Sequence, residues 1–128
     1  MSQIFLSKSL PNFYHLLTDL YFTVAMEITN HKNLNSGVLT IRVSGDVDLY
    51  SASILYKTYC TIADRGESLV HFDFSAVNYL DSSGVGAIIR ILQVAKSKGL
   101  RLSFSGIQGT PRKVLAMSNI LPLLKEVE

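Results

Sequence analysis

Hydrophobic and polar residues alternate along several short segments of the chain, and alternation with a period of two is typical of a strand with one buried face. The pattern appears at residues 22–29 and returns at residues 39–43, after a polar loop at 30–37. Two later segments, 70–74 and 100–104, also carry an apolar side chain at every second position. These four segments are predicted to be strands.

Between these strands the apolar positions recur every three or four residues, which is the spacing of an amphipathic helix. The first helix is predicted at about 51–65, where Gly66 ends it, and the second at about 83–98, where Gly99 ends it. A third, short helix is expected to begin with Thr110 as N-cap and Pro111 at the first helical position. The last apolar residues of the chain are then expected to dock on the core: Leu121, Leu123 and Leu124.

The second helix has an unusually wide apolar surface. Its expected core stripe includes Val85, Ile88 and Leu92, but Ala87 and Ile91 extend the apolar arc over more than half of the circumference. Two interpretations remain open: the helix is held between the sheet and another element, or part of the arc faces a partner.

The order of the elements, β-β-α-β-α-β-α, predicts an α/β fold in which helices pack against one mixed sheet of four to five strands. Right-handed crossovers through the first two helices would make the later strands parallel. A chain of 128 residues with 48% hydrophobic and 17% charged residues is long and apolar enough for one domain with a single core.

The N-terminal residues are treated separately as a leader of uncertain role at 1–21, followed by the domain at 22–128. The apolar stretch 13–26 is interrupted by His15 and Asp19, and it is too short and polar to insert into a membrane. Residues 10–20 are expected to form a short helix that covers an edge of the domain; alternatively, translation starts at Met26.

Charge and cysteine content exclude several classes of function. The formal net charge of +2, without a basic cluster, gives no reason to expect binding to nucleic acid. Cys60 is the only cysteine, which excludes an internal disulfide and fits a cytoplasmic protein. The three histidines stand far apart without a second ligand at suitable spacing, so no metal site is expected.

The sequence also lacks the motifs of an enzyme. Gly84 and Gly86 open a helix after a strand, but Ile89 stands where a dinucleotide-binding loop has its third glycine. Ser82 and Ser83 do not lie in the Gly-x-Ser-x-Gly turn of a serine hydrolase, and no histidine is suitably placed to act as their base. We therefore expect neither catalysis nor a cofactor.

Two adjacent hydroxyls, those of Ser82 and Ser83, are predicted at the start of the second helix. The free N–H groups and the positive end of the helix dipole favour an anion at this place, so a phosphate added there would be tolerated by the fold. The neighbouring carboxylates, Asp81 and Asp48, would sharpen the electrostatic change. The alternative is that one of the serines simply serves as an N-cap.

Residues 43–48 (Val-Ser-Gly-Asp-Val-Asp) and 74–86 (Phe-Ser-Ala-Val-Asn-Tyr-Leu-Asp-Ser-Ser-Gly-Val-Gly) resemble the two signature stretches of STAS domains, in particular those of bacterial anti-sigma factor antagonists. The resemblance extends from about residue 26 to 127. It implies a partner switch, in which the protein binds an anti-sigma factor that is also a serine kinase. Phosphorylation by that kinase releases the protein, and a serine phosphatase resets it.

The resemblance also implies roles for individual residues. Ser82 is the expected phosphate acceptor, Asp81 precedes it, Asp48 is the nearby loop carboxylate, and Ser83, beside Gly84, is the expected helix cap. Only the resemblance chooses Ser82 over Ser83. Tyr50 and the apolar arc of the second helix are assigned to the docking surface.

A second function remains open, because STAS-like proteins also serve as accessory subunits of membrane lipid-transport ABC complexes. Such a subunit would not need a phosphorylatable serine at position 82, so the residue present there favours the partner switch.

Overall fold

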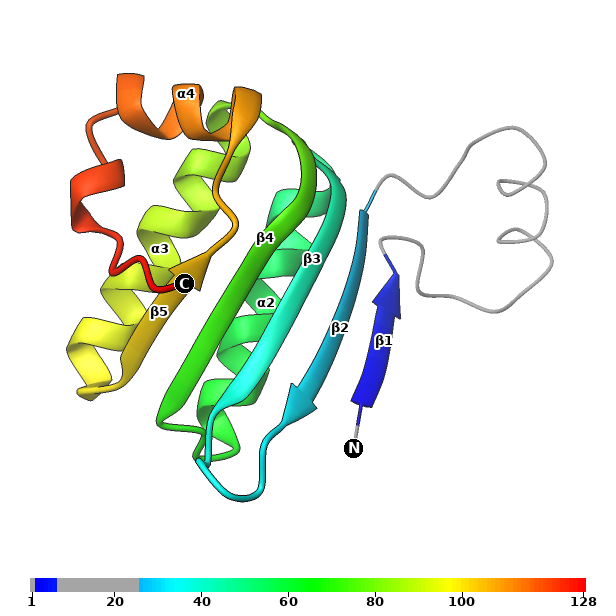
Figure 1. The fold of residues 1–128 in the computed structure, drawn as a ribbon, viewed down its shortest axis with the longest axis vertical. Helices are drawn as coiled ribbons and strands as arrows, with labels where there is room; N and C mark the ends of the chain where they lie inside the picture. The colour runs from blue at the N-terminus through cyan, green and yellow to red at the C-terminus, as the bar shows by residue number, and fades with distance from the viewer. Residues whose placement is uncertain (1, 7–25) are drawn as a thin grey trace, which may run out of the picture.

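The computed structural model describes residues 2–6 and 26–128, which form one five-stranded sheet covered by helices (Figure 1). The strands lie in the order in which they occur along the chain, β1-β2-β3-β4-β5. The first three are antiparallel, and β3, β4 and β5 are parallel. The elements are β1 (Ser2–Leu6), β2 (Met26–Lys32), β3 (Leu39–Val47), α2 (Ser51–Asp64), β4 (Leu69–Leu80), α3 (Ser82–Lys98), β5 (Arg101–Ser105), α4 (Gly109–Met117) and the 3-10 turn η1 (Leu121–Leu123).

The expected α/β fold with a mixed sheet and the order β-β-α-β-α-β-α is confirmed from β2 onward. In addition, β1 lies within residues 1–21, which were expected to form a separate leader, and it pairs with β2. The predicted helix at 10–20 and the first residues of the predicted strand at 22–29 lie outside the described residues. Within the described residues, no helix combines the length and apolar character needed to cross a membrane.

The core lies between the sheet and the helices α2 and α3, which run side by side across one face (Figure 1). Its centre is aromatic: the rings of Phe72 and Phe104 stack at 5.3 Å between centroids, and Phe74 meets both edge-on. Tyr59 of α2 lies on Phe72 with its centroid 6.0 Å away. Such pairs stabilise the fold beyond the burial of their surface.

The wide apolar arc of α3 is largely explained by this core. Ala87, Ile88 and Ile91 are buried, while Ile89 and Leu92 pack against the core with part of their surface exposed. Contact with both α2 and β5 accounts for the width of the arc, as expected for a helix held between the sheet and a second element.

Three local predictions were wrong. The strand expected at 70–74 is part of β4, which continues to Leu80. The alternation of buried and exposed positions ends after Phe74 because β4 shifts register twice against β3. The helix α4 begins at Gly109 after Gln108, so Thr110 is not its N-cap. Leu124 is buried as expected and Leu121 packs on the core, but Leu123 is 67% exposed.

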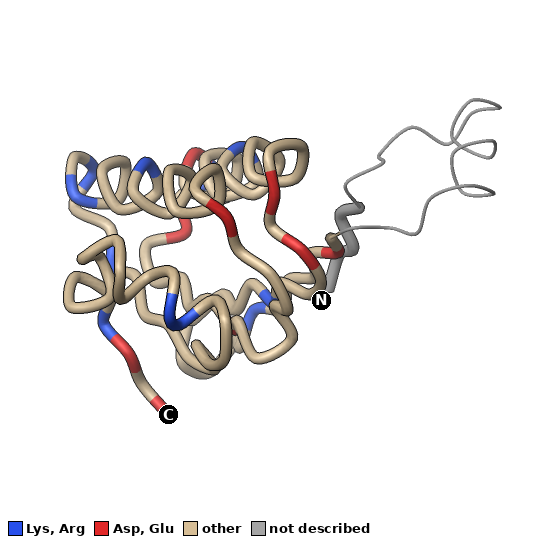
Figure 2. The backbone as a smooth tube through the Cα atoms, turned by 90° about the horizontal axis from the view of Figure 1, so that it is seen from above, with Lys and Arg blue, Asp and Glu red and all other residues tan. Residues whose placement is uncertain are grey.

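Charged residues are distributed over most of the elements. Figure 2 shows Lys and Arg at separate places along the backbone, with Asp and Glu between them. Several of these charges form ion pairs between elements: Lys32–Glu67, Arg42–Asp73, Lys98–Asp64 and Arg112–Glu126.

Candidate functional site

The site is built where the parallel strands β3 and β4 end. Val47 and Leu80 are the last paired residues, and the N–H of Asp81 donates to the carbonyl of Val47 at 3.3 Å. Asp48 and Asp81 therefore leave neighbouring strands at the same edge of the sheet. The carboxyl ends of parallel strands are a common place for functional residues in α/β folds.

Asp81 is the N-cap of α3. Its Oδ1 accepts hydrogen bonds from the N–H groups of Ser83 at 2.9 Å and Gly84 at 3.2 Å, while its backbone is extended. The expectation that Ser83 caps this helix was wrong, because the carboxylate of Asp81 already accepts from the N–H groups of Ser83 and Gly84.

With Asp81 as cap, both serine hydroxyls are left free of a capping role. Ser82 is the first residue of α3 and is exposed, whereas Ser83 is half-buried. Neither hydroxyl forms a hydrogen bond with any residue that the structure describes. The geometry thus separates the two serines by accessibility, a distinction that their adjacent positions in the sequence do not provide.

Gly84 brings the start of α3 close to the strand ends. A Cβ at this position would collide with Cδ1 of Leu80 and stand 3.1 Å from Cγ1 of Val47, both buried side chains. A larger residue would push the first turn of the helix away from the sheet. Gly84 is therefore a positioning residue, which sets how far Ser82 stands from the loop after β3.

Asp48 organises the loop between β3 and α2. Its Oδ1 accepts from the N–H groups of Tyr50 and Ser51 at 3.0 Å each and from the Ser51 hydroxyl at 3.1 Å. Burial alone would raise the pKa of Asp48, but the hydrogen bonds from Ser51 and Tyr50 outweigh it and hold the pKa below its ordinary value. The carboxylate is charged at neutral pH and is fixed in place.

Ser51 is a residue of this site that the sequence analysis missed. It is fully buried, and its hydroxyl accepts from the N–H of Asp48 at 2.9 Å and shares its single proton between the carbonyl of Asp46 at 2.8 Å and Oδ1 of Asp48 at 3.1 Å. The signal was present in the spacing Asp48-x-x-Ser51, which resembles the reciprocal arrangement of a capping box.

Three large apolar side chains are exposed at this end of the sheet. Leu49 is 68% exposed, Tyr50 82% and Tyr79 45%, and we call these three residues the apolar rim. Tyr79 lies opposite Asp46 in the β3–β4 ladder, one pair before the strands end. Tyr50 was expected at the docking surface from the sequence, whereas Leu49 and Tyr79 were not, because their exposure and the register of β3 and β4 are properties of the fold.

Metal-ligating side chains do not cluster in the part of the chain that the structure describes. No group of three or more His, Cys, Asp or Glu side chains that could hold a metal ion occurs among residues 2–6 and 26–128. What the arrangement provides is an exposed hydroxyl at a helix start, two fixed carboxylates and the apolar rim.

The chain is similar to known proteins in both sequence and fold. The family model described as the STAS domain matches residues 19–127. An anti-sigma-B factor antagonist from Bacillus subtilis (strain 168) is 26% identical over 82 residues, which cover 64% of this chain and 74% of that protein.

Two solved structures of the Bacillus protein SpoIIAA share the fold. Its unphosphorylated form, described as an anti-sigma factor antagonist, has a TM-score of 0.66 at 20% identity, with 79% of this chain and 88% of that chain covered. Its phosphorylated form has a TM-score of 0.60 at 20% identity, with 79% and 91% covered.

Proposed function

The chain belongs to the STAS domain family, and from this membership we propose that the protein is an anti-sigma factor antagonist switched by phosphorylation at Ser82. In this proposal it is a regulatory binding protein and not an enzyme. Its partner is an anti-sigma factor with serine kinase activity, and a serine phosphatase reverses the modification. The similarity to a Bacillus anti-sigma-B factor antagonist supports the class of partner.

One observation carries the proposal: the carboxylate of Asp81 caps α3, and the exposed Ser82 hydroxyl at the start of that helix forms no hydrogen bond with the residues that the structure describes. A kinase can reach this hydroxyl without unfolding the cap. The existence of a phosphorylated structure of a protein with the same fold is consistent with this use.

The apolar rim supplies the surface on which the partner docks. Exposed Tyr side chains such as Tyr50 and Tyr79 are typical of residues that contribute strongly to protein–protein binding, and the exposed Leu49 adds apolar surface that a partner can cover. In the unphosphorylated protein the rim and the neutral Ser82 hydroxyl lose little solvation energy when a partner covers them. Because Tyr50 and Tyr79 flank the loop of Asp48, this surface adjoins the fixed carboxylates.

Phosphorylation would change this surface without changing the fold. A phosphate adds about 1.5 to 2 negative charges, which the helix dipole favours but which Asp81 and Asp48 repel in a dry interface. Reversal of a 99:1 population requires about 5.5 kcal/mol of difference in binding. A docked partner would strip water from the phosphate dianion and hold it near two carboxylates. Both effects weaken binding, and together they supply a large part of this free-energy difference.

The proposal is tested by affinity capture from the native cell lysate with the unmodified protein and three variants. We expect the wild type and Ser82→Ala to retain a kinase-like ATPase, identified by mass spectrometry, and Ser82→Asp to lose it. The matched control Ser83→Ala should behave as wild type. Capture of transporter subunits irrespective of residue 82 would instead identify an accessory subunit of a lipid-transport complex.

A second step tests the acceptor. When the captured partner is supplied with ATP, phosphate should appear on the wild type and on Ser83→Ala but not on Ser82→Ala. Phosphate transfer to Ser82→Ala at the wild-type rate would refute the assignment of the acceptor, while leaving the docking surface intact.

A further inference from the structure

The face of the sheet opposite α2 and α3 is polar along most of its length but not at one end. Residues that alternate with the aromatic core point to this open face, among them His71, Asp73 and Ser103. Where β4 and β5 begin, however, Val38 and Leu69 occupy the corresponding positions and are both half-buried. This is the end of the sheet away from Ser82.

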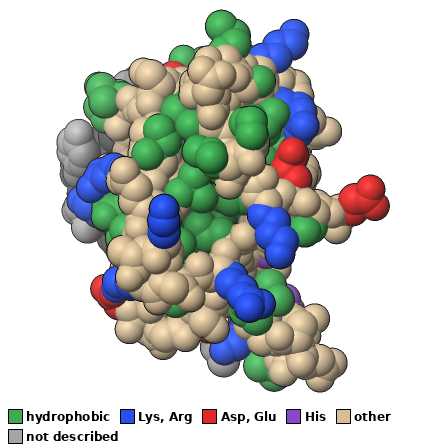
Figure 3. Space-filling model, turned by 90° about the vertical axis from the view of Figure 1, so that its left-hand side faces the viewer, with side chains coloured by type: hydrophobic (Ala, Val, Ile, Leu, Met, Phe, Trp, Pro, Cys, Tyr) green, Lys and Arg blue, Asp and Glu red, His purple; other side chains and the backbone are tan. Residues whose placement is uncertain are grey.

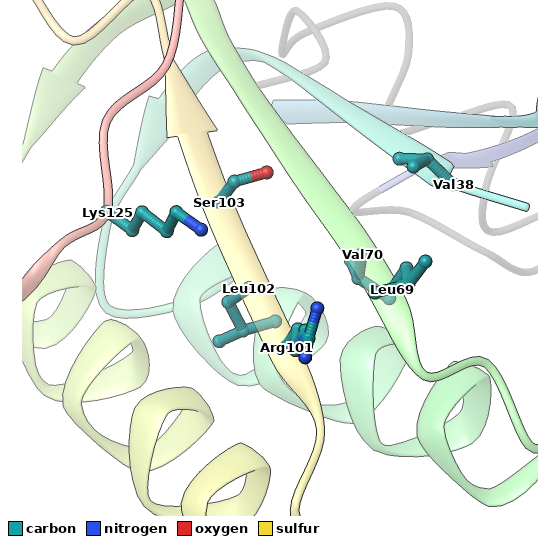
Figure 4. A pocket seen from close by; sticks show the side chains of 7 residues that line it. All are labelled: Val38, Leu69, Val70, Arg101, Leu102, Ser103 and Lys125. Carbon is teal, nitrogen blue, oxygen red and sulfur yellow. The ribbon is translucent and has the colours of Figure 1, made fainter. Parts of the chain in front are cut away.

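A hollow of about 150 Å³ lies over these aliphatic side chains (Figure 4). Leu102 also lines the hollow, although its side chain packs partly against the core. Two cations border the hollow: Arg101 on β5 and Lys125 on the C-terminal segment. Figure 4 shows the Lys125 side chain reaching from that segment toward β5. The left-hand side of the molecule in Figure 1, which faces the viewer in Figure 3, carries an exposed hydrophobic area with Lys and Arg side chains around it; the hollow itself is shown in Figure 4.

The position of Lys125 is set by the backbone. The N–H of Phe104 donates to the carbonyl of Lys125 at 2.8 Å, and the N–H of Val127 donates to the carbonyl of Phe104 at 2.7 Å. These two bonds fasten the C-terminal segment to the outer edge of β5. One cation of the hollow is therefore attached to the sheet by a hydrogen-bonded segment, and the other lies on the sheet itself.

The positive charge at the hollow is not neutralised by the described residues. Neither Arg101 nor Lys125 takes part in an ion pair with them. Two acidic residues close to the lining residues in the chain are engaged elsewhere: Glu67, two residues before Leu69, pairs with Lys32 at 2.9 Å, and Glu126, next to Lys125, pairs with Arg112 at 2.7 Å. Two cations that form no ion pair with the described residues, above an aliphatic floor, are complementary to a molecule that has an anionic head and a short apolar tail.

A neutral hydrogen-bonding group completes the lining. The Ser103 hydroxyl is 2.7 Å from Nδ1 of His71, whose Nε2 is 2.7 Å from the hydroxyl of Ser105. Ser103 is thus held in a fixed orientation on β5. Its oxygen adds a polar contact between the aliphatic floor and the two cations.

We propose that this hollow binds a short-chain monocarboxylate, with the carboxylate between Arg101 and Lys125 and the hydrocarbon tail over Val38 and Leu69. Guanidinium and ammonium groups both form strong, charge-assisted hydrogen bonds to carboxylates. The site is separate from the Ser82 surface, so its occupation requires neither phosphorylation nor the anti-sigma factor.

The test uses the full chain labelled with ¹⁵N and titrated with millimolar hexanoate, followed by the amide signals of residues 69, 101, 102 and 103. These signals should shift with saturation, whereas acetate and hexanol, which have only the head or only the tail, should bind at least about tenfold more weakly. Arg101→Gln and Lys125→Gln, which change exposed residues, should each weaken hexanoate binding several-fold. In both variants the amide signals of residues far from the hollow should keep their positions. Lys113→Gln, an exposed cation on α4, is the matched control and should bind as wild type.

Absence of saturable shifts at these four amides would overturn the proposal. So would equal binding of hexanol and hexanoate, since the cations would then have no role. Unchanged affinity in both Arg101→Gln and Lys125→Gln would refute the placement of the carboxylate. None of these outcomes depends on Ser82, so they leave the partner switch untouched.

Discussion

At the scale of single residues, the central feature of the site is that Asp81 caps α3 while the neighbouring Ser82 does not. The carboxylate of Asp81 satisfies two N–H groups of the first turn of α3, and the hydroxyl of Ser82 is left without a structural role. A serine that capped the helix could be modified only at the expense of the cap. Here modification and helix stability are assigned to two neighbouring side chains.

The capping role of Asp81 leads to a prediction about stability. Asp81→Ala should lower the free energy of unfolding by about 1 kcal/mol, because the N–H groups of Ser83 and Gly84 lose their acceptor. Asp81→Asn should lose less, since the amide oxygen can still accept. Urea denaturation measures both values. Ser82→Ala serves as the control and should stay within about 0.5 kcal/mol of wild type; a loss as large as that of Asp81→Ala would show that the hydroxyl has a structural role.

At the scale of elements, the contact between α3 and the strand ends depends on Gly84. Gly84→Ala should destabilise the protein by about 1–3 kcal/mol, because its Cβ would collide with buried Leu80 and Val47. Gly86→Ala in the same helix is the matched control: no atom lies within 4 Å of the added Cβ, and alanine should stabilise the helix by up to about 1 kcal/mol. Thermal unfolding should therefore shift in opposite directions. A gain of stability in both variants would contradict the close approach.

The stability of the contact between β4 and β5 is expected to depend on pH through His71, which lies against Ser103 and Ser105. Burial lowers the pKa of His71 below its ordinary value of 6.5, although the nearby charge of Asp73 acts in the opposite direction. The unfolded chain thus takes up a proton at higher pH than the folded one, so the contribution of His71 is fully present above pH 6.5 and is lost as the pH falls through the folded pKa.

We therefore expect the free energy of unfolding to be larger at about pH 7.5 than at about pH 5.5, and the difference to shrink in His71→Gln. Denaturation at the two pH values measures this difference. His31→Gln, which changes an exposed residue of β2, should leave it as in wild type. An unchanged difference in His71→Gln would assign the pH dependence to other groups.

The sequence predicted the elements better than their ends. Periodicity located β2 to β5 and the helices α2 and α3, because each buries one regular face, whereas α4 was located from the Thr110-Pro111 pair near its start. It stopped β4 too early, since beyond Phe74 the buried positions become Val77 and Leu80 and no longer alternate. Ser83 was expected as the helix cap because the family resemblance assigned Ser82 to the phosphate; capping propensity alone does not decide between an Asp and the two Ser residues that follow it.

The candidate site was predictable only in part for a related reason. Ser82, Asp81 and Asp48 are close to one another because two parallel strands end together, which the order of elements implies. The apolar rim and the buried hydroxyl of Ser51 depend on register and burial. Neither quantity can be obtained from residue types at separate positions.

At the scale of the whole molecule, β4 connects two distinct regions of the sheet. It begins beside the hollow at Leu69 and ends beside Ser82, and its 12 residues span roughly 35 Å at about 3.3 Å per residue. The proposed carboxylate site and the proposed switch therefore lie at opposite ends of one strand. Binding at one end can be measured without steric interference from a partner at the other.

The bounds of the domain give a prediction at this scale. We propose that residues 22–128 form the domain, so a variant that begins at residue 22 should fold cooperatively and be phosphorylated at Ser82 like the full chain. Loss of the ladder between β1 and β2 should lower its melting temperature, because β2 then becomes an edge strand. Calorimetry and the phosphorylation assay check the two parts. A variant without a cooperative transition would show that the N-terminal residues belong to the folding unit.

The two register shifts in β4 have a consequence for how related sequences should be aligned. From Arg42 to Asp46 the strand β3 advances four residues, while β4 advances six, from Asp73 to Tyr79. Each extra residue turns the following side chains to the other face, and the second shift reverses the first. Loss of a single residue between Asp73 and Asp81 would therefore place polar side chains in the core and turn the acceptor serine away from its loop. Insertions and deletions in proteins that use this serine should accordingly gather in the loop between β2 and β3, and the spacing before the Asp-Ser pair should stay constant.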